Sequence, residues 1–297
     1  MNSLSRLLPR MCTVAPCASK RAGRRAEGQF LLDSDSNMRP LPAASINNCP
    51  TISFALVAVT IVSVFGCDKP NSSRFDSEPL MAQARTEYRA GRNDIAIKLF
   101  SEVIKHERQS NEAFYGRALA LHGRAFEKNE FEGLNPVGES LADFKNALAD
   151  FDRAIAIDSN LALCYEYRAD TKWVLRQLES AKKDYTRTIE LDPKSASSFA
   201  SRAEIVATLG QLAEALSDIS VAVELAPTNT DFRFTKGCLL FENGEAREAL
   251  LALNSIEEEL SNQAEFFQVR SEVLRELEQI DEALADQEAA KSLRSGE

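Results

Sequence analysis

A short pattern containing alanine recurs at a fixed interval through the last three quarters of the chain. It reads Ala-x3-large-x2-small, and its alanines are Ala96, Ala147, Ala181, Ala215, Ala249 and Ala283. The last four alanines are separated by 34 residues each. Spacings of three and four residues place the members of the pattern on one face of an α-helix. A fixed interval of this length predicts an array of stacked helical units.

A second pattern lies upstream of the first, an aromatic residue four positions before a small one. Its pairs are Phe114/Ala118, Tyr165/Ala169 and Phe199/Ala203, weakening to Arg233/Gly237 and Phe267/Ser271. Between the two patterns stand Gly91, Gly210 and Gly244 in the same register. Glycine at such a place supplies the left-handed backbone that ends a helix. Each unit is therefore predicted to be a helix–turn–helix.

A 34-residue helix–turn–helix with these positions filled resembles the tetratricopeptide repeat (TPR). The resemblance covers residues 77–297 and implies an all-α, right-handed superhelical solenoid of about six units. The expected units are 77–110, 111–161, 162–195, 196–229, 230–263 and 264–297. In the last unit Gln287 replaces an apolar residue, as expected for the polar outer face of a terminal cap.

The second unit is too long. It spans 51 residues, 17 more than the period, and the excess lies in residues 122–140. We expect a lengthened helix pair with a projecting loop, in which Ser140, followed by Asp143, caps the second helix. The alternative interpretation is a protrusion that contacts a specific partner, because insertions in repeat arrays map to one face.

The resemblance also implies a concave groove, lined by the second, fifth, ninth and twelfth positions of each unit. The candidate groove residues are Glu112, Tyr115, Glu166, Asp170, Trp173, Glu204, Phe234 and Phe241. An acidic and aromatic lining suits a basic or proline-containing peptide, through charge complementarity and stacking. For Trp173 the alternative is a place in the core between helices.

The N-terminal quarter has a different pattern, an apolar run that ends at Cys67. Residues 52–65 form a strongly apolar stretch of 14 residues. This is shorter than the roughly 20 residues of a membrane-spanning helix, but it is typical of a signal-peptide core. The tetrapeptide Val-Phe-Gly-Cys that closes the run resembles the lipobox of bacterial lipoproteins. The resemblance implies cleavage before Cys67 and a lipid on its sulfur.

We therefore expect residues 38–66 to be a lipoprotein-type signal peptide and residues 67–76 a polar linker. Residues 1–37 then become an over-long N-terminus or a targeting segment, since signal peptides seldom begin so far upstream. Two alternatives stay open. The Arg- and Ser-rich start is typical of an organelle transit peptide, and residues 41–66 could form an uncleaved anchor helix.

Charge and composition exclude other classes of function. The chain has a net charge of −10, and residues 68–297 hold 28 Lys/Arg against 42 Asp/Glu. Such an acidic body is a poor candidate for binding nucleic acid. His106 and His122 lie in no nucleophile or metal motif, and Cys164 and Cys238 are expected to be free thiols. We expect no catalytic residue, metal site or cofactor.

The sequence therefore predicts a non-enzymatic scaffold that mediates protein–protein interactions. Its expected location is the bacterial cell envelope, where Cys67 tethers it to a membrane and the repeats face the periplasm or the exterior. The alternatives are a structural assembly factor that forms homo-oligomers through its own repeats, and a soluble or organellar adaptor with an uncleaved N-terminal anchor.

Overall fold

The computed structural model describes residues 76–295, and thirteen α-helices make up 79% of them. The helices follow one another as pairs: α3 (Glu78–Arg89) with α4 (Asn93–His106), α5 (Asn111–Lys128) with α6 (Gly138–Ile157), α7 (Ala162–Val174) with α8 (Leu178–Leu191), α9 (Ala196–Thr208) with α10 (Leu212–Leu225), α11 (Thr230–Glu242) with α12 (Ala246–Asn254), and α14 (Ala264–Glu276) with α15 (Ile280–Ser295). A short helix, α13 (Glu257–Leu260), stands before the last pair. The predicted signal peptide at 38–66 and Cys67 lie outside the described residues.

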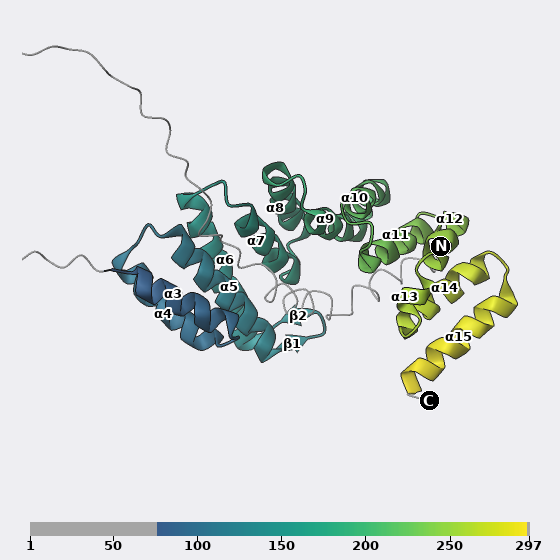
Figure 1. Ribbon diagram of the computed structural model, residues 1–297, viewed down its shortest axis with the longest axis horizontal. Helices are drawn as coiled ribbons and strands as arrows, with labels where there is room; N and C mark the ends of the chain where they lie inside the picture. The colour runs from purple at the N-terminus through teal and green to yellow at the C-terminus, as the bar shows by residue number, and fades with distance from the viewer. Residues whose placement is uncertain (1–75, 296–297) are drawn as a thin grey trace, which may run out of the picture.

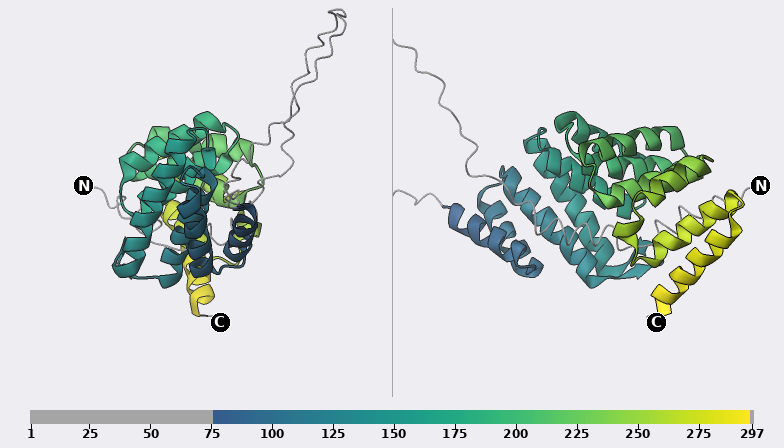
Figure 2. Two further views of the ribbon diagram at one scale, coloured as in Figure 1. Left: turned by 90° about the vertical axis from the view of Figure 1, so that its left-hand side faces the viewer. Right: turned by 45° about the vertical axis from the view of Figure 1, so that its right-hand side comes forward.

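The pairs stack side by side along a curved array (Figures 1 and 2). In Figure 1 the first helices α7, α9 and α11 lie nearer the concave side, and α8 and α10 lie on the outer side. The predicted all-α solenoid is confirmed. We call the side formed by the first helices the concave surface.

The alanine pattern marks buried positions in the contacts between helices. All six of its alanines have side chains that are completely buried. The large residue four positions later is buried too in five units: Phe100, Phe151, Tyr185, Ile219 and Leu253. A methyl group permits a short distance between helix axes, and the large side chain fills the space beside it. The pattern thus indicates the core of each pair and its contact with the next.

The short turns between paired helices contain one residue with a left-handed backbone conformation, at an equivalent position in each turn. Gly91, Gly210 and Gly244 have φ angles of 71°, 79° and 84°, which confirms the role predicted for them. In the third and sixth pairs the same place is taken by Arg176 and Glu278, both with φ of 60°. The turn geometry is therefore kept where glycine is missing, at the cost of some backbone strain.

The long second unit contains a small hairpin between its helices. Strands β1 (Phe131–Glu132) and β2 (Asn135–Pro136) pair antiparallel and join α5 to α6. The ring of Phe131 stacks on Phe126 at a centroid distance of 6.3 Å and meets Phe144 edge-on. The expected projecting loop is thus an ordered hairpin fixed to α5 and α6 by aromatic contacts.

The predicted cap of α6 was wrong. The helix begins at Gly138, and Ser140 lies inside it, where its hydroxyl donates to the carbonyl of Ala125. The capping acceptor is Glu130: its Oε2 accepts from the backbone N–H of Glu139 at 2.6 Å and of Ser140 at 3.2 Å. The hairpin brings Glu130 back to the helix start, and nothing in the local pattern around Ser140 indicates this.

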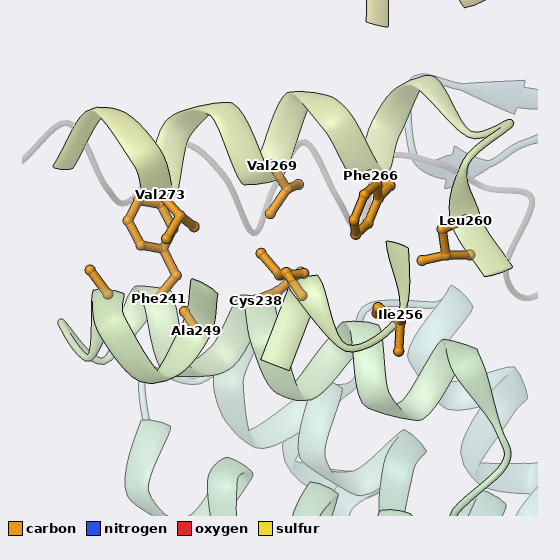
Figure 3. Close-up of a cluster of buried hydrophobic side chains, with 10 residues drawn as sticks. Cys238, Phe241, Ala249, Ile256, Leu260, Phe266, Val269 and Val273 are labelled. Carbon is orange, nitrogen blue, oxygen red and sulfur yellow. The ribbon is translucent and has the colours of Figure 1, made fainter. Parts of the chain in front are cut away.

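The fifth pair departs from the regular plan. Helix α12 stops at Asn254, and α13 follows before the last pair. Leu260 of α13 joins Ile256 and Phe266 in a buried cluster that also contains Cys238 and Val273 (Figure 3). The contact between the fifth and sixth pairs is therefore an apolar core to which the short helix adds its own side chain.

Candidate functional site

The candidate acidic residues of the concave surface are partly used in contacts between pairs. Glu112 of α5 accepts from Nε of Arg85 of α3 at 2.7 Å. Glu166 of α7 is only 4% exposed and accepts from the hydroxyl of Ser197 at 3.1 Å. Asp170 accepts a hydrogen bond from the phenol of Tyr185. These three carboxylates connect α5 to α3, and α7 to both α8 and α9.

The candidate aromatic residues divide into two groups. Tyr115, Trp173 and Phe234 are half-buried, and each packs against a core cluster from the first helix of its pair. The Phe234 ring lies 6.3 Å from the ring of Phe266 of the next pair. Phe241, in contrast, is 5% exposed and lies between α11 and α14 (Figure 3). Phe241 is therefore a packing residue in this structure and offers little surface to a ligand.

Two acidic side chains of successive first helices keep accessible surface. Glu204 of α9 is half-buried, and Asp231 at the start of α11 is exposed. Asp231 occupies the second position of its unit, one of the positions that the repeat resemblance predicts to line the groove. Phe234 lies three residues further along α11 and is half-buried, so it too keeps some accessible surface. We call Glu204, Asp231 and Phe234 the groove patch.

Burial changes the ionisation of several groups in α5, α8 and α11. Loss of water around Tyr115 and Tyr185 raises the pKa of each phenol well above its usual value, and the charge of Asp170 raises that of Tyr185 further. Burial likewise raises the pKa of Glu242, on α11, to about 7. One of the Glu242 carboxylate oxygens is buried and has no hydrogen-bond partner among the described residues.

His122 is a base whose ionisation is strongly changed by burial. It lies in α5, 5% exposed, with Nδ1 2.9 Å from the hydroxyl of Thr171 and its ring edge-on to Phe126 and Phe144. Burial lowers its pKa to about 4, although the charge of Asp170 acts in the opposite direction. A histidine so enclosed is neutral near pH 7, and it links the second pair to the third.

Acidification is expected to destabilise the protein through His122. The unfolded chain binds a proton near the usual pKa of 6.5, whereas the folded chain does so only near 4. Stability attributable to this group is therefore present above pH 6.5 and is lost as the pH falls toward 4. Between pH 7 and pH 4.5 the loss is about 2 kcal/mol. Urea titrations of the wild type and His122→Gln at both pH values measure it, and an equal loss in both proteins would contradict the assignment.

The sequence reasoning missed a repeated ion pair that joins the two helices of a pair. In each case an arginine of the first helix donates from Nε and Nη2 to both oxygens of an aspartate of the second. The pairs are Arg117–Asp150, Arg168–Asp184, Arg202–Asp218 and Arg270–Asp286, with N–O distances of 2.7–2.8 Å. The aspartate side chains are 7–8% exposed. Bidentate geometry makes these pairs stronger and more specific than single hydrogen bonds.

Each of these arginines also lies over an aromatic ring three residues earlier. The rings are Phe114, Tyr165, Phe199 and Phe267, at 5.2–5.8 Å from the guanidinium carbon. A cation over a ring face is an additional favourable contact. The aromatic residues of the second sequence pattern thus position the arginine in addition to filling the core.

Within residues 76–295 no cluster of three His, Cys, Asp or Glu side chains has the arrangement of a metal site. Cys164 and Cys238 are buried free thiols, as predicted. No helix in the described part of the chain combines the length and the apolar character needed to span a membrane.

Comparison with known proteins supports the repeat assignment. The family model described as tetratricopeptide repeat matches residues 81–130 and 168–230. A search of curated proteins found none that matches this chain.

Solved structures match over most of their own length. YrrB, described as a TPR protein with an unusual peptide-binding site, is 21% identical, with a TM-score of 0.54 over 66% of this chain and 92% of that chain. PilF of Pseudomonas aeruginosa is 14% identical, with a TM-score of 0.59 over 74% of this chain and 93% of that chain. MamA of Desulfovibrio magneticus RS-1 is 17% identical, with a TM-score of 0.53 over 63% of this chain and 96% of that chain. The helix pairs of this protein therefore form a solenoid of the tetratricopeptide-repeat type.

Proposed function

We propose that this protein is a non-enzymatic scaffold whose concave surface binds a basic or proline-containing peptide of a partner protein. The observation that carries the proposal is the groove patch: Glu204 of α9 and Asp231 of α11 keep accessible carboxylates on successive first helices, and the half-buried ring of Phe234 follows Asp231 on α11. Carboxylates attract lysine and arginine, and an aromatic ring stacks with proline or with a cation. YrrB, whose fold is similar, has a peptide-binding site, which agrees with this use of the solenoid.

The contacts and exposure of each acidic residue determine which substitutions can test the proposal. Replacing Glu166 would break a contact between the third and fourth pairs, and replacing Asp170 would break a contact within the third pair, because both accept hydrogen bonds from neighbouring helices. Glu204 and Asp231 keep accessible surface, so their replacement alters the concave charge with less effect on folding. A matched control is available on the outer helices, where Glu190 of α8 and Glu224 of α10 are exposed.

The Glu204→Lys/Asp231→Lys variant is expected to lose affinity for a basic peptide. Fluorescent peptides of alternating lysine and proline, and of alternating glutamate and proline, provide the probe and its charge-reversed control in an anisotropy titration. Wild type and Glu190→Lys/Glu224→Lys should bind the lysine peptide with similar affinity, and the groove variant about tenfold more weakly. Equal affinity in all three proteins, or equal binding of the two peptides, would contradict the proposal.

The proposal includes a membrane tether at Cys67, placing the repeats at a bacterial envelope membrane. It rests on the apolar run at 52–65 and the Val-Phe-Gly-Cys that closes it. A single acyl chain gives only marginal membrane binding, so a lasting anchor needs the two or three chains that a lipoprotein carries. The linker between Cys67 and the first helix would keep the solenoid close to the membrane surface.

Cys67→Ser is expected to release the protein from membranes or to leave its precursor uncleaved. Membrane fractionation, combined with the mass of the mature N-terminus, measures both effects. Cys49→Ser changes a cysteine in the same uncharged region and should alter neither. Unchanged attachment and processing of Cys67→Ser would exclude the lipoprotein anchor and leave the concave-surface proposal untouched.

A further inference from the structure

A hollow lies against the second helices of the first two pairs. It is formed by the last turns of α4 and α6, by the turn that leads into α5 and by the start of α5, and its volume is about 840 Å³. Ligand pockets in proteins commonly have volumes of about 300–1,000 Å³. Because α4 and α6 are second helices of their pairs, this hollow belongs to the outer side of the solenoid. We call it the outer pocket.

The charge of the outer pocket is opposite to that of the chain. Every ionisable side chain that lines it is basic, although the whole chain has a net charge of −10. Two of the four cations are compensated, Arg117 by Asp150 at 2.7 Å and Lys105 by Glu102 at 2.6 Å. Arg108 and Arg153 are exposed and form no ion pair within residues 76–295. The pocket therefore keeps two uncompensated positive charges.

The floor of the outer pocket is apolar. Ile104 of α4, Phe114 of α5 and Ile157 of α6 line it, and all three are half-buried. A ligand that brought only negative charge would leave these side chains against water. Complementarity requires one or two anionic groups next to an apolar group.

The surroundings of the pocket disfavour an extended polyanion. Glu102 of α4 and Asp152 of α6 lie on the helices that form it, with side chains 45% and 63% exposed. A nucleic acid or an anionic bilayer spreads negative charge over a wide area and would meet these carboxylates. A short peptide segment can place its carboxylates at Arg108 and Arg153 and leave the neighbouring surface free.

We propose that the outer pocket binds an acidic peptide segment in which carboxylates flank an aliphatic or aromatic side chain. The carboxylates pair with Arg108 and Arg153, and the apolar side chain covers Ile104, Phe114 and Ile157. This site is distinct from the groove patch in position and in sign of charge. The solenoid would then hold two peptides of opposite charge, one on each side, and so connect two partners.

A fluorescent peptide with glutamates flanking a leucine tests the proposal on the full chain by anisotropy titration. Arg108→Glu/Arg153→Glu should lower the affinity at least about tenfold, because it reverses both free charges. Lys145→Glu/Arg247→Glu makes the same change of charge at exposed positions outside the pocket and should bind like the wild type. Glu204→Lys/Asp231→Lys should bind this peptide at least as well as the wild type.

Three results would overturn the proposal. The first is that a control peptide binds as tightly as the glutamate–leucine peptide. One control peptide has glutamines in place of the glutamates, and the other has serine in place of the leucine. The second is unchanged affinity of Arg108→Glu/Arg153→Glu, shown by circular dichroism to be folded. The third is failure to bind the glutamate peptide while vesicles of anionic lipid are bound and Arg108→Glu/Arg153→Glu abolishes that binding, which would assign the pocket to a lipid surface.

Discussion

Arg270→Ala is expected to lower the free energy of unfolding by about 4 kcal/mol, because it leaves the carboxylate of Asp286 buried and unpaired. The Arg270 side chain is 10% exposed and holds both oxygens of Asp286, which is 7% exposed, at 2.7 and 2.8 Å. It also pairs with Glu257 at 2.7 Å and lies over the ring of Phe266. Removing the guanidinium leaves a buried carboxylate without its partner.

A double variant separates the effect of the unpaired carboxylate from the effect of lost packing. Arg270→Met/Asp286→Leu removes both charges and retains apolar volume, so it should cost far less than Arg270→Ala. Arg247→Ala, at an exposed position of α12, should change stability by no more than about 0.5 kcal/mol. Urea titrations followed by circular dichroism compare the three, and a double variant as unstable as the single one would refute the explanation by the unpaired carboxylate.

Phe151→Ala is expected to cost about 4 kcal/mol by opening a cavity between the second and third pairs. The Phe151 ring is completely buried in a cluster with Leu119, Ala147 and Cys164, and it lies 6.2 Å from the ring of Tyr115. Since each pair of a solenoid contacts only its neighbours, the loss falls on one junction.

Hydrogen exchange of the same variant locates the effect along the chain. Protection should fall most in α5, α6 and α7, and least in α14 and α15. Leu251→Ala is the matched control, because the Leu251 side chain is 72% exposed and its truncation should change stability by no more than about 0.5 kcal/mol. A loss below about 1 kcal/mol for Phe151→Ala would mean that this ring does not hold the junction together.

The helix pairs could be predicted from the sequence because their signal is periodic. A helix repeats every 3.6 residues and this solenoid every 34, so Ala181 and Ala215 are found at equivalent places and both are completely buried. The turns that contain glycine could be predicted as well, for example the turn at Gly210. Arg176 and Glu278 adopt the same left-handed backbone, but neither residue type indicates a turn by itself.

The repeated ion pair was present in the sequence and could have been found. Arg168 and Asp184 are 16 residues apart, and the same separation recurs twice more. In the second unit Arg117 and Asp150 are 33 residues apart, which is the same separation lengthened by the 17 inserted residues. The insertion therefore adds a hairpin and longer helices without moving the helix faces that meet.

For the groove residues, the sequence predicts the place of each residue in its repeat but not whether its side chain is exposed. A place in the repeat fixes the direction of a side chain relative to its own helix, whereas burial depends on the next pair. Trp173 and Phe241 hold the same position of their units, yet Trp173 is half-buried and Phe241 is 5% exposed. The difference arises where the fifth pair ends early and α14 packs over α11 (Figure 3). No pattern within the fifth unit indicates that contact.

The most direct test of the concave-surface proposal is photocrosslinking in the cell with a photoreactive amino acid at one of two positions. Asp231 lies at an exposed position of the first helix α11, and Glu224 lies at an exposed position of the outer helix α10. We expect a discrete crosslinked partner from position 231, lost when Glu204→Lys is added, and none of that mass from position 224. A partner crosslinked from position 224 alone would contradict the proposal that the concave surface is the binding face.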